Sequence, residues 1–202
     1  MSATSEIEQL ISDSLSQGDS LDKITRKIYL LFPTHAFKNQ YDLQLNLLTE
    51  ISNHFEIPIS CIHIVGSAKT GVSFIKGTPF SPENSDIDIA IVDQYLFHKS
   101  FEYSFKVSKG WQLNSFSVRS DSEMTKRRRS EFLDYLQKGI FRPEKMPNSK
   151  LRGDLLSFFG RLSGNYSSFC KEISVWIYAS EHFLTAKQTS AVEKFLSNKG
   201  NV

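Results

Sequence analysis

Cysteine is scarce in this chain of 202 residues, and long hydrophobic runs are missing from it. Its two cysteines, Cys61 and Cys170, both lie among apolar residues, which favours buried free thiols in a reducing compartment over a disulfide. No apolar run approaches the roughly 20 residues that a membrane-spanning helix requires. Residues 1–6 lack the basic and apolar segments of a signal peptide. These absences predict a cytoplasmic protein with no membrane partner.

An excess of charge of either sign is also missing, because 24 Lys and Arg residues balance 22 Asp and Glu residues to a net charge of +2. That excess is too small to indicate nucleic-acid binding by itself. The 40% of hydrophobic and 23% of charged residues are ordinary for a globular protein, and the length suits one domain. We therefore predict a single domain over residues 1–202, with helices in 1–57, a motif core in 60–93, and further helices and strands in 94–202.

The most informative segment is present in residues 85–92, which read Ser-Asp-Ile-Asp-Ile-Ala-Ile-Val. Side chains alternate between the faces of a β-strand, so Asp86 and Asp88 share one face while the isoleucines point into a core. Two like charges on one face of a buried strand repel each other and resist desolvation. A divalent cation removes that objection, since Mg²⁺ and Mn²⁺ prefer carboxylate and phosphate oxygens. The pair predicts a metal site; acids exposed at a strand end are the weaker interpretation.

A second motif lies upstream, where Gly66 and Ser67 follow the predicted strand 61–65. A Gly-Ser turn provides a tight backbone and a hydroxyl suited to a phosphate tail. Together with Asp86 and Asp88, this turn resembles the motif of the nucleotidyltransferase superfamily of DNA polymerase β. In that family an apolar strand, Gly and then Gly or Ser precede a spacer and an Asp-x-Asp strand. Here the spacer is long, and its excess at 74–84 predicts a loop inserted beside the site.

The resemblance implies a fold, a reaction and the roles of several residues. The fold class is α/β (α+β), a small mixed sheet of the nucleotidyltransferase type with helices packed around it. The chain would transfer a nucleoside monophosphate from an NTP to an acceptor hydroxyl, on a nucleotide, a nucleic acid or a protein, and release pyrophosphate. Asp86 and Asp88 would hold Mg²⁺ or Mn²⁺, and Gly66, Ser67 and Lys69 would bind the phosphates. Members found beside bacterial defence and toxin–antitoxin genes are similar, which suggests antiviral defence.

The resemblance also implies a third catalytic carboxylate on a later strand, and this chain departs from the pattern there. The predicted strand 173–178 reads Ile-Ser-Val-Trp-Ile-Tyr and has no acid at its centre. Glu172, just before it, is the best substitute; Asp121 and Asp154 are more remote candidates. A catalytically inactive module that binds nucleotide or a partner protein is therefore an alternative. The basic run 126–129 suggests a third interpretation, nucleic-acid binding, although such runs more often form the solvated face of a helix.

Hydrophobic periodicity and breaker residues predict the remaining elements. The late strand places Trp176 and Tyr178 on one face, for core packing or for stacking on a base. We expect helices at 5–15, 21–33 with Ser20 as N-cap, 38–55, from 70–74 onward, 95–109, 123–138, 151–162 and 185–196; strands at 61–65, 86–92 and 173–178; a strand or irregular segment at 110–120; and a loop at 139–150.

Overall fold

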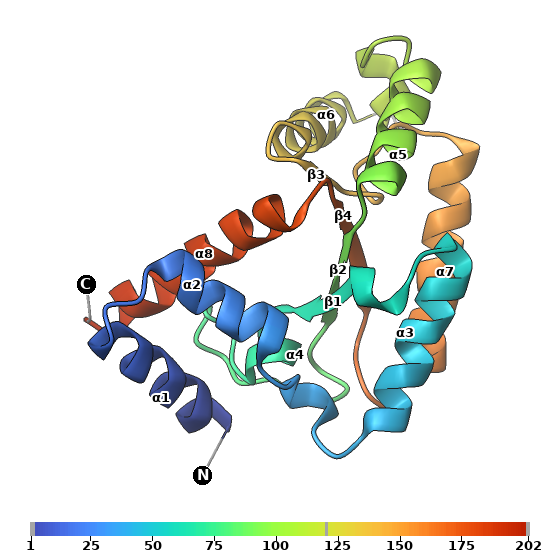
Figure 1. The fold of residues 1–202 in the computed structure, drawn as a ribbon. Helices are drawn as coiled ribbons and strands as arrows, with labels where there is room; N and C mark the ends of the chain where they lie inside the picture. The colour runs from blue at the N-terminus through green and yellow to red at the C-terminus, as the bar shows by residue number, and fades with distance from the viewer. Residues whose placement is uncertain (1–2, 120, 201–202) are drawn as a thin grey trace.

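A four-stranded mixed sheet lies at the centre of the computed structural model, which describes residues 3–119 and 121–200 (Figure 1). The expected domain also included residues 1–2, 120 and 201–202, which lie outside the described residues. The strands are β1 (Ile62–Val65), β2 (Ile87–Val92), β3 (Ile140–Phe141) and β4 (Ile173–Tyr178), in the order β1-β2-β4-β3. The central strands β2 and β4 run parallel, and β1 and β3 pair with them antiparallel at the two edges.

Within the described residues, eight α-helices surround this sheet, so the architecture is mixed α+β. A π-helical turn, Lys27–Leu31, continues directly from the second helix. The α-helices are α1 (Ala3–Ser16), α2 (Leu21–Arg26), α3 (Tyr41–Phe55), α4 (Gly66–Thr70), α5 (Gln94–Val107), α6 (Ser122–Leu136), α7 (Lys150–Asn165) and α8 (Glu181–Asn198). No helix in these described ranges combines the length and the apolar character needed to cross a membrane.

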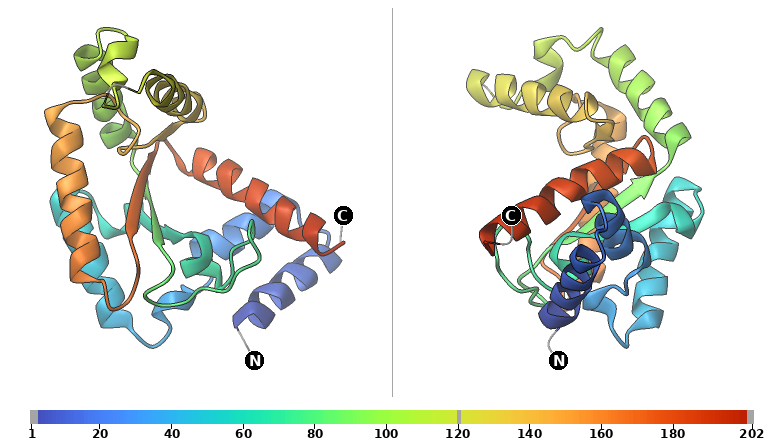
Figure 2. Two further views of the ribbon diagram at one scale, coloured as in Figure 1. Left: turned by 180° about the vertical axis from the view of Figure 1, so that it is seen from behind. Right: turned by 60° about the vertical axis from the view of Figure 1, so that its left-hand side comes forward.

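The two faces of the sheet differ in chemistry. One face presents Ile87, Ile89 and Ile91 with the alternate residues of β4, and it packs against α3 and α7 in an apolar core. The opposite face presents Asp88 and Ala90, and α1, α2 and α8 lie on that side (Figure 2). Since strand side chains alternate with period two, one buried face and one face with polar residues follow from a single sequence. The polar face is where a site has room to form.

Most elements predicted from the sequence are confirmed, two are wrong, and the segment predicted as either a strand or an irregular connection is irregular. The Ser20 side chain accepts a hydrogen bond from the Lys23 amide at 3.3 Å and caps α2, as predicted. The helix expected from 70–74 instead spans Gly66–Thr70, because Gly71 turns into the left-handed region at φ +81° and ends it. The segment 110–119 contains a 3₁₀ turn and no sheet strand. The loop expected at 139–150 contains β3, which is too short to show an alternating pattern.

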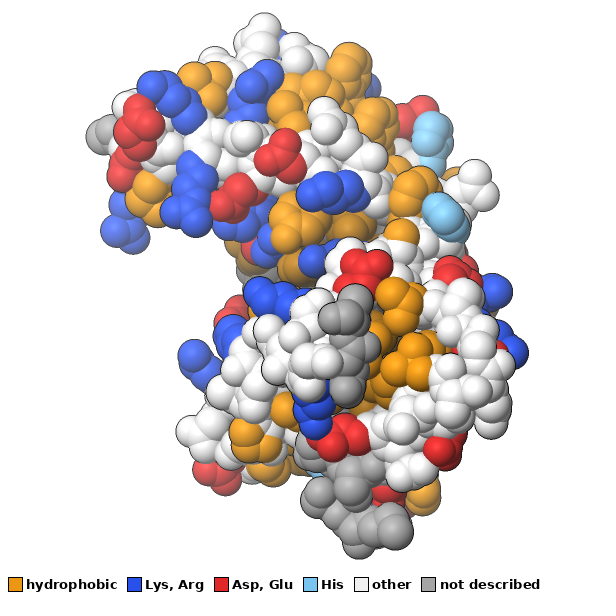
Figure 3. All heavy atoms as spheres, turned by 90° about the vertical axis from the view of Figure 1, so that its left-hand side faces the viewer, with side chains coloured by type: hydrophobic (Ala, Val, Ile, Leu, Met, Phe, Trp, Pro, Cys, Tyr) orange, Lys and Arg blue, Asp and Glu red, His pale blue; other side chains and the backbone are white. Residues whose placement is uncertain are grey.

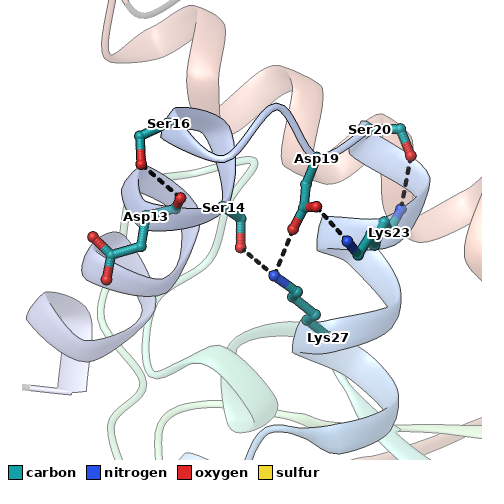
Figure 4. Close-up of polar contacts among 7 residues, drawn as sticks. All are labelled: Asp13, Ser14, Ser16, Asp19, Ser20, Lys23 and Lys27. Carbon is teal, nitrogen blue, oxygen red and sulfur yellow. Dashed lines mark hydrogen bonds and ion pairs between the residues drawn. The ribbon is translucent and has the colours of Figure 1, made fainter.

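A buried carboxylate fixes the angle between α1 and α2 (Figure 4). Asp19, in the turn between these helices, accepts hydrogen bonds from Lys23 and Lys27, and its side chain is 5% exposed. The Lys27 ammonium also donates to the Ser14 hydroxyl of α1 at 2.9 Å. The two lysines hold the pKa of Asp19 below its ordinary value, because hydrogen bonds to the carboxylate favour its charged form. The network stabilises the helices that partly cover the polar face.

The basic run on α6 serves the fold. Lys126 pairs with Glu123 at 2.7 Å and Arg127 with Glu131 at 2.8 Å. The Arg129 side chain donates to the Trp111 carbonyl at 2.6 Å.

Arg128 is 8% exposed; it donates to the Asn148 side-chain oxygen at 2.8 Å and to the carbonyls of Phe116, Lys145 and Met146. Each residue of the run is therefore engaged within the chain, which weakens the interpretation that the run binds nucleic acid.

We expect Arg128→Met to lower the free energy of unfolding by about 3 kcal/mol, because several buried carbonyls lose a charged donor. Urea denaturation followed by circular dichroism measures this loss. Arg127→Met is the matched control, since Arg127 is largely exposed and its ion pair is worth about 0.5 kcal/mol. Equal losses in the two variants would contradict a structural role specific to Arg128.

Candidate functional site

A cavity of about 370 Å³ opens on the polar face of the sheet. Its walls are the last residue of β1, the start of β2, one face of β4, the loop after α4 and one side of α8. Its chemically relevant residues are Tyr29, Gly66, Ser67, Ser73, Lys76, Asn84, Asp86, Asp88, Ser174, Trp176, Tyr178, Lys187 and Gln188. The loop wall is fixed because Phe74 stacks on Phe195 of α8, with ring centroids 4.3 Å apart. This loop is the segment that the long spacer predicted beside the motif.

Asp88 lies at the floor of the cavity. In the parallel register of β2 and β4 it pairs with Ser174, whose hydroxyl donates to the Asp88 Oδ1 atom at 2.8 Å. Burial raises the pKa of Asp88 above its ordinary value, and the neighbouring charge of Asp86 raises it further. The Ser174 hydrogen bond and the charges of Lys76 and Arg142 oppose these effects without reversing them. A carboxylate in this position favours a cation beside it.

Asp86 lies at the mouth of the same cavity and is exposed. Backbone hydrogen bonds on both sides fix the position of Asp86. The Lys171 amide donates to the Ser85 carbonyl at 3.0 Å, and the Ile87 amide donates to the Glu172 carbonyl at 2.8 Å. The two aspartates therefore line one cavity, at unequal depth. Unequal depth gives one partly buried and one solvated carboxylate, which suits a cation that keeps part of its water shell.

Gly66 makes the closest approach to Asp88. Its φ of +64° is in the left-handed region, and a Cβ atom built on it would lie 2.5 Å from the Asp88 Oδ2 atom. Only glycine satisfies both conditions without strain. Ser67 follows at the start of α4, and it is partly buried and lines the cavity. The motif thus brings Gly66, Ser67, Asp86 and Asp88 together, although they come from two segments of the chain.

Two predicted site residues lie elsewhere. Lys69 is 6% exposed, and its amino group donates to the Phe32 carbonyl, outside the lining of the cavity. Burial lowers the pKa of Lys69 to about 8. Glu172 is exposed, is absent from the cavity lining, and contributes only its backbone carbonyl to the sheet. α4 turns Lys69 away from the cavity, and the position before β4 leaves Glu172 in solvent.

The remote acid candidates have structural roles. Asp121 caps α6 by accepting a hydrogen bond from the Met124 amide at 2.8 Å. Asp154 pairs with Lys150 one turn earlier on α7, at 2.7 Å. In the described residues no group of three or more His, Cys, Asp or Glu side chains is placed to hold a metal ion. A cation in the cavity would therefore have two carboxylates, hydroxyl oxygens and its own ligands as donors, and these hard oxygens fit Mg²⁺ or Mn²⁺.

The sequence interpretation missed several cavity residues, of which Ser174 and Lys187 matter most. The strand 173–178 was predicted with its correct bounds, but its pairing with β2 was not. Parallel pairing of these two strands is what places Ser174 against Asp88. Lys187 comes from α8, whose position over the sheet no local pattern reveals. Trp176 and Tyr178 do share a face, as predicted, and that face lines the cavity.

We expect Gly66→Ala to destabilise the chain more than Gly77→Ala. Both glycines have positive φ, but a Cβ atom on Gly77 meets nothing within 4 Å. Gly77→Ala is the control and measures the cost of backbone strain alone, about 1 kcal/mol. In Gly66→Ala the contact with Asp88 adds roughly a further 1–3 kcal/mol, as in overpacked cores. Thermal or urea unfolding measures both variants, and equal losses would contradict the close approach.

The raised pKa of Asp88 gives stability a defined pH dependence in metal-free buffer. Because the folded state disfavours the charged carboxylate, ionisation costs stability as pH rises from the ordinary value of 3.8 through the raised value. Asp88→Asn removes that cost while its amide oxygen still accepts from Ser174. We expect a higher Tm than wild type at pH 7, and a gain that disappears below pH 3.8.

Asp134→Asn, on the exposed side of α6, is the control, with no gain expected. A lower Tm for Asp88→Asn at pH 7 would show that its negative charge stabilises the fold. Calorimetric scans across the pH range, with chelator present, measure both variants.

Comparisons of the chain with protein-family models, with curated proteins and with solved structures found no match. They therefore assign no family to the chain. The cavity and its residues are the basis on which a function is inferred.

Proposed function

We propose that the chain is a metal-dependent nucleotidyltransferase that acts in the cavity at Asp86 and Asp88. The observation that carries this proposal is the placement of two carboxylates in one cavity against the Gly66–Ser67 turn. A partly buried acid beside a second acid has little structural purpose, because desolvation and repulsion both oppose its charge. An anion-binding wall beside a cation-binding floor matches a nucleoside triphosphate and its metal.

Each of these residues has a distinct role in the proposal. Asp86 and Asp88 hold Mg²⁺ or Mn²⁺; when bound, the cation neutralises triphosphate charge and lowers the pKa of the attacking hydroxyl. Ser67 donates a hydrogen bond to a phosphate oxygen. Lys76 and Lys187 flank the cavity from the loop and from α8, and they complement the remaining negative charge.

In the proposed reaction an acceptor hydroxyl oxygen forms a bond to the α-phosphorus of the NTP. The bond from that phosphorus to the α,β-bridging oxygen breaks, and pyrophosphate leaves with the electron pair. The hydroxyl proton passes to water at the exposed mouth of the cavity, where Asp86 lies. Positioning and electrostatics supply most of the rate, so few side chains are required.

The sheet supports a nucleotidyltransferase-type fold as part of the same proposal. The Gly66–Ser67 turn follows β1, Asp86 directly precedes β2 and Asp88 is its second residue, and a parallel neighbour, β4, lies where a third acid is expected. Kinship with nucleotidyltransferases of bacterial defence or toxin–antitoxin systems, and a role in antiviral defence, are included in this proposal.

A second candidate function is a non-catalytic module that binds nucleotide or a partner protein. Ser174 favours it, because the β4 position directly beside Asp88 carries a hydroxyl and no acid. With two carboxylates, a cation bound with NTP is held, but activation of the acceptor hydroxyl is weaker. Binding of NTP without turnover is the signature of this candidate.

We expect the chain to release pyrophosphate from labelled NTPs in Mg²⁺ or Mn²⁺. We expect Asp86→Asn and Asp88→Asn each to lower the rate by at least about 100-fold, because mutating even the residues that orient metal ligands costs about 10- to 100-fold. Glu172→Gln is the acidic control, and its rate is expected to stay within about twofold because the side chain lies outside the cavity. A rate assay across the four NTPs, with a panel of acceptors, makes the measurement.

Isothermal calorimetry on the same variants separates the two candidates. Metal-dependent NTP binding that is lost in Asp88→Asn, without turnover for any acceptor, favours the non-catalytic module. Absence of both binding and turnover refutes the site itself. Loss of activity in Glu172→Gln would restore that residue as the third carboxylate.

A further inference from the structure

A polar side chain interrupts the apolar stripe along α8. Gln188 is 8% exposed, and its neighbours one turn away on the same stripe, Leu184 and Val192, are 1% and 0% exposed. Residues four apart lie on one face of a helix, so an apolar residue is expected at position 188. A buried carboxamide costs free energy unless it is hydrogen-bonded. Gln188 also lines the cavity, which indicates that a ligand there uses its amide.

The Tyr178 hydroxyl is a partner of this amide within the chain. A side-chain hydrogen bond from Gln188 lowers the pKa of the Tyr178 phenol, although burial raises that pKa by more. A hydrogen bond that lowers the pKa of an acid is donated to it, so Gln188 uses one amide N–H for this bond. A carboxamide also has a second N–H and a carbonyl oxygen. Since Tyr178 lines the cavity as well, the bond orients these two groups on the cavity wall.

The aspartates and Gln188 lie toward different ends of the cavity. Ser174 and Tyr178 share a face of β4, and Ser174 contacts Asp88. Four residues of a strand span about 13 Å, which is the backbone distance between Ser174 and Tyr178. A ligand that contacts both Asp88 and Gln188 therefore has to be elongated. A nucleotide with its phosphates at the aspartates has this shape, and its base would lie toward Gln188.

Aromatic surface lies between these two ends. Trp176, between Ser174 and Tyr178 on the same face of β4, lines the cavity. The Arg142 guanidinium lies 4.2 Å from the centroid of the Trp176 ring, which holds the ring in place. Aromatic faces stack on any nucleobase, because every base has a π-face. Stacking therefore holds a base without selecting it, and selection requires a group that hydrogen-bonds to the edge of the base.

An indentation of the surface gives a ligand access beside α8. Figure 3 shows it between the part of the molecule that carries α6 and the part that carries α8, with Lys and Arg side chains along its edges. One side of α8 is a wall of the cavity, where Lys187 precedes Gln188. Positive charge near an opening favours the entry of an anionic ligand such as a triphosphate.

We infer that Gln188 selects the base of the donor nucleotide and that this base is adenine. The inference rests on the proposed function and identifies which NTP the cavity takes. A glutamine amide binds adenine through two hydrogen bonds: its carbonyl oxygen accepts from the N6 amino group, and its N–H donates to a ring nitrogen. Guanine and uracil present a carbonyl oxygen in place of that amino group, so two oxygens would face each other. Cytosine has the amino group but a smaller ring to stack on Trp176, and it ranks second.

Isothermal calorimetry of the full-length chain with Mg²⁺ and each of the four NTPs measures this selection. ATP is expected to bind at least about tenfold more tightly than GTP or UTP, which is within the range that one bidentate pair discriminates. Gln188→Leu, which suits the apolar stripe of α8, is expected to bring the four dissociation constants within about threefold of one another by weakening ATP binding. Tyr178→Phe removes the bond that orients the amide, so the preference for ATP over GTP is expected to fall while both still bind.

Gln137→Leu is the matched control. Gln137 is exposed at the end of α6 and is absent from the cavity lining, so this variant is expected to keep the wild-type preference. A purely structural role for Gln188 predicts a lower Tm in Gln188→Leu with an unchanged preference for ATP, which would overturn the inference. Equal binding of the four NTPs by the wild type, or a preference for GTP or UTP, would overturn it as well.

Pyrophosphate release, measured on the same samples, separates this inference from the proposed function. If ATP binds selectively, the selection is lost in Gln188→Leu and no acceptor is modified, the adenine subsite stands and the transferase proposal fails. If all four NTPs release pyrophosphate at equal rates, with or without the Gln188 side chain, the transferase stands and this inference fails. If no NTP binds, both fail.

Discussion

The partial burial of one carboxylate, Asp88, near the start of the central strand β2 is the constraint on which the site depends. It requires a glycine at position 66, because the backbone there approaches Asp88 too closely for any Cβ atom. It also requires a donor on the neighbouring strand, which Ser174 provides at 2.8 Å. The hydrogen bond from Ser174 stabilises a charge that burial disfavours. Such a cost is typical of carboxylates at functional sites, and this is the reason for placing the proposed function at Asp88.

The two faces of the sheet separate stability from chemistry. Ile87, Ile89 and Ile91 bury one face of β2 completely, so the strand stays in register however polar its other face becomes. The polar face is covered only in part, by α8 and by the helices that Asp19 connects. A cavity forms in the uncovered part. Such a division lets binding residues lie on rigid strands, where their geometry is better defined than on loops.

Features that depend on residues close together in the sequence could be predicted, and features that depend on residues far apart could not. Apolar and polar residues alternate along β2 and β4, and this pattern is visible in the local sequence. Both strands, and the shared face of the aspartates, were therefore predicted correctly. The contact of Ser174 with Asp88 depends on parallel pairing across more than eighty residues, which no local pattern encodes. Lys69 lies outside the cavity lining for a related reason: the helix begins at Gly66 itself, and the Lys69 amino group contacts the Phe32 carbonyl. Long-range packing decided both cases.

The charges around the cavity favour an anionic ligand together with a cation over either one alone. Two carboxylates line the cavity and one divalent cation would neutralise them; Lys76 and Lys187 then leave an excess of positive charge. Without the cation, Asp86 and Asp88 repel a phosphate, and the two aspartates repel each other. Coulomb interactions are strongest where water is excluded, so the two ligands reinforce each other most at the partly buried Asp88. Under the proposed function, this arrangement of charges therefore predicts cooperative binding of metal and phosphate, whether or not a transfer step follows.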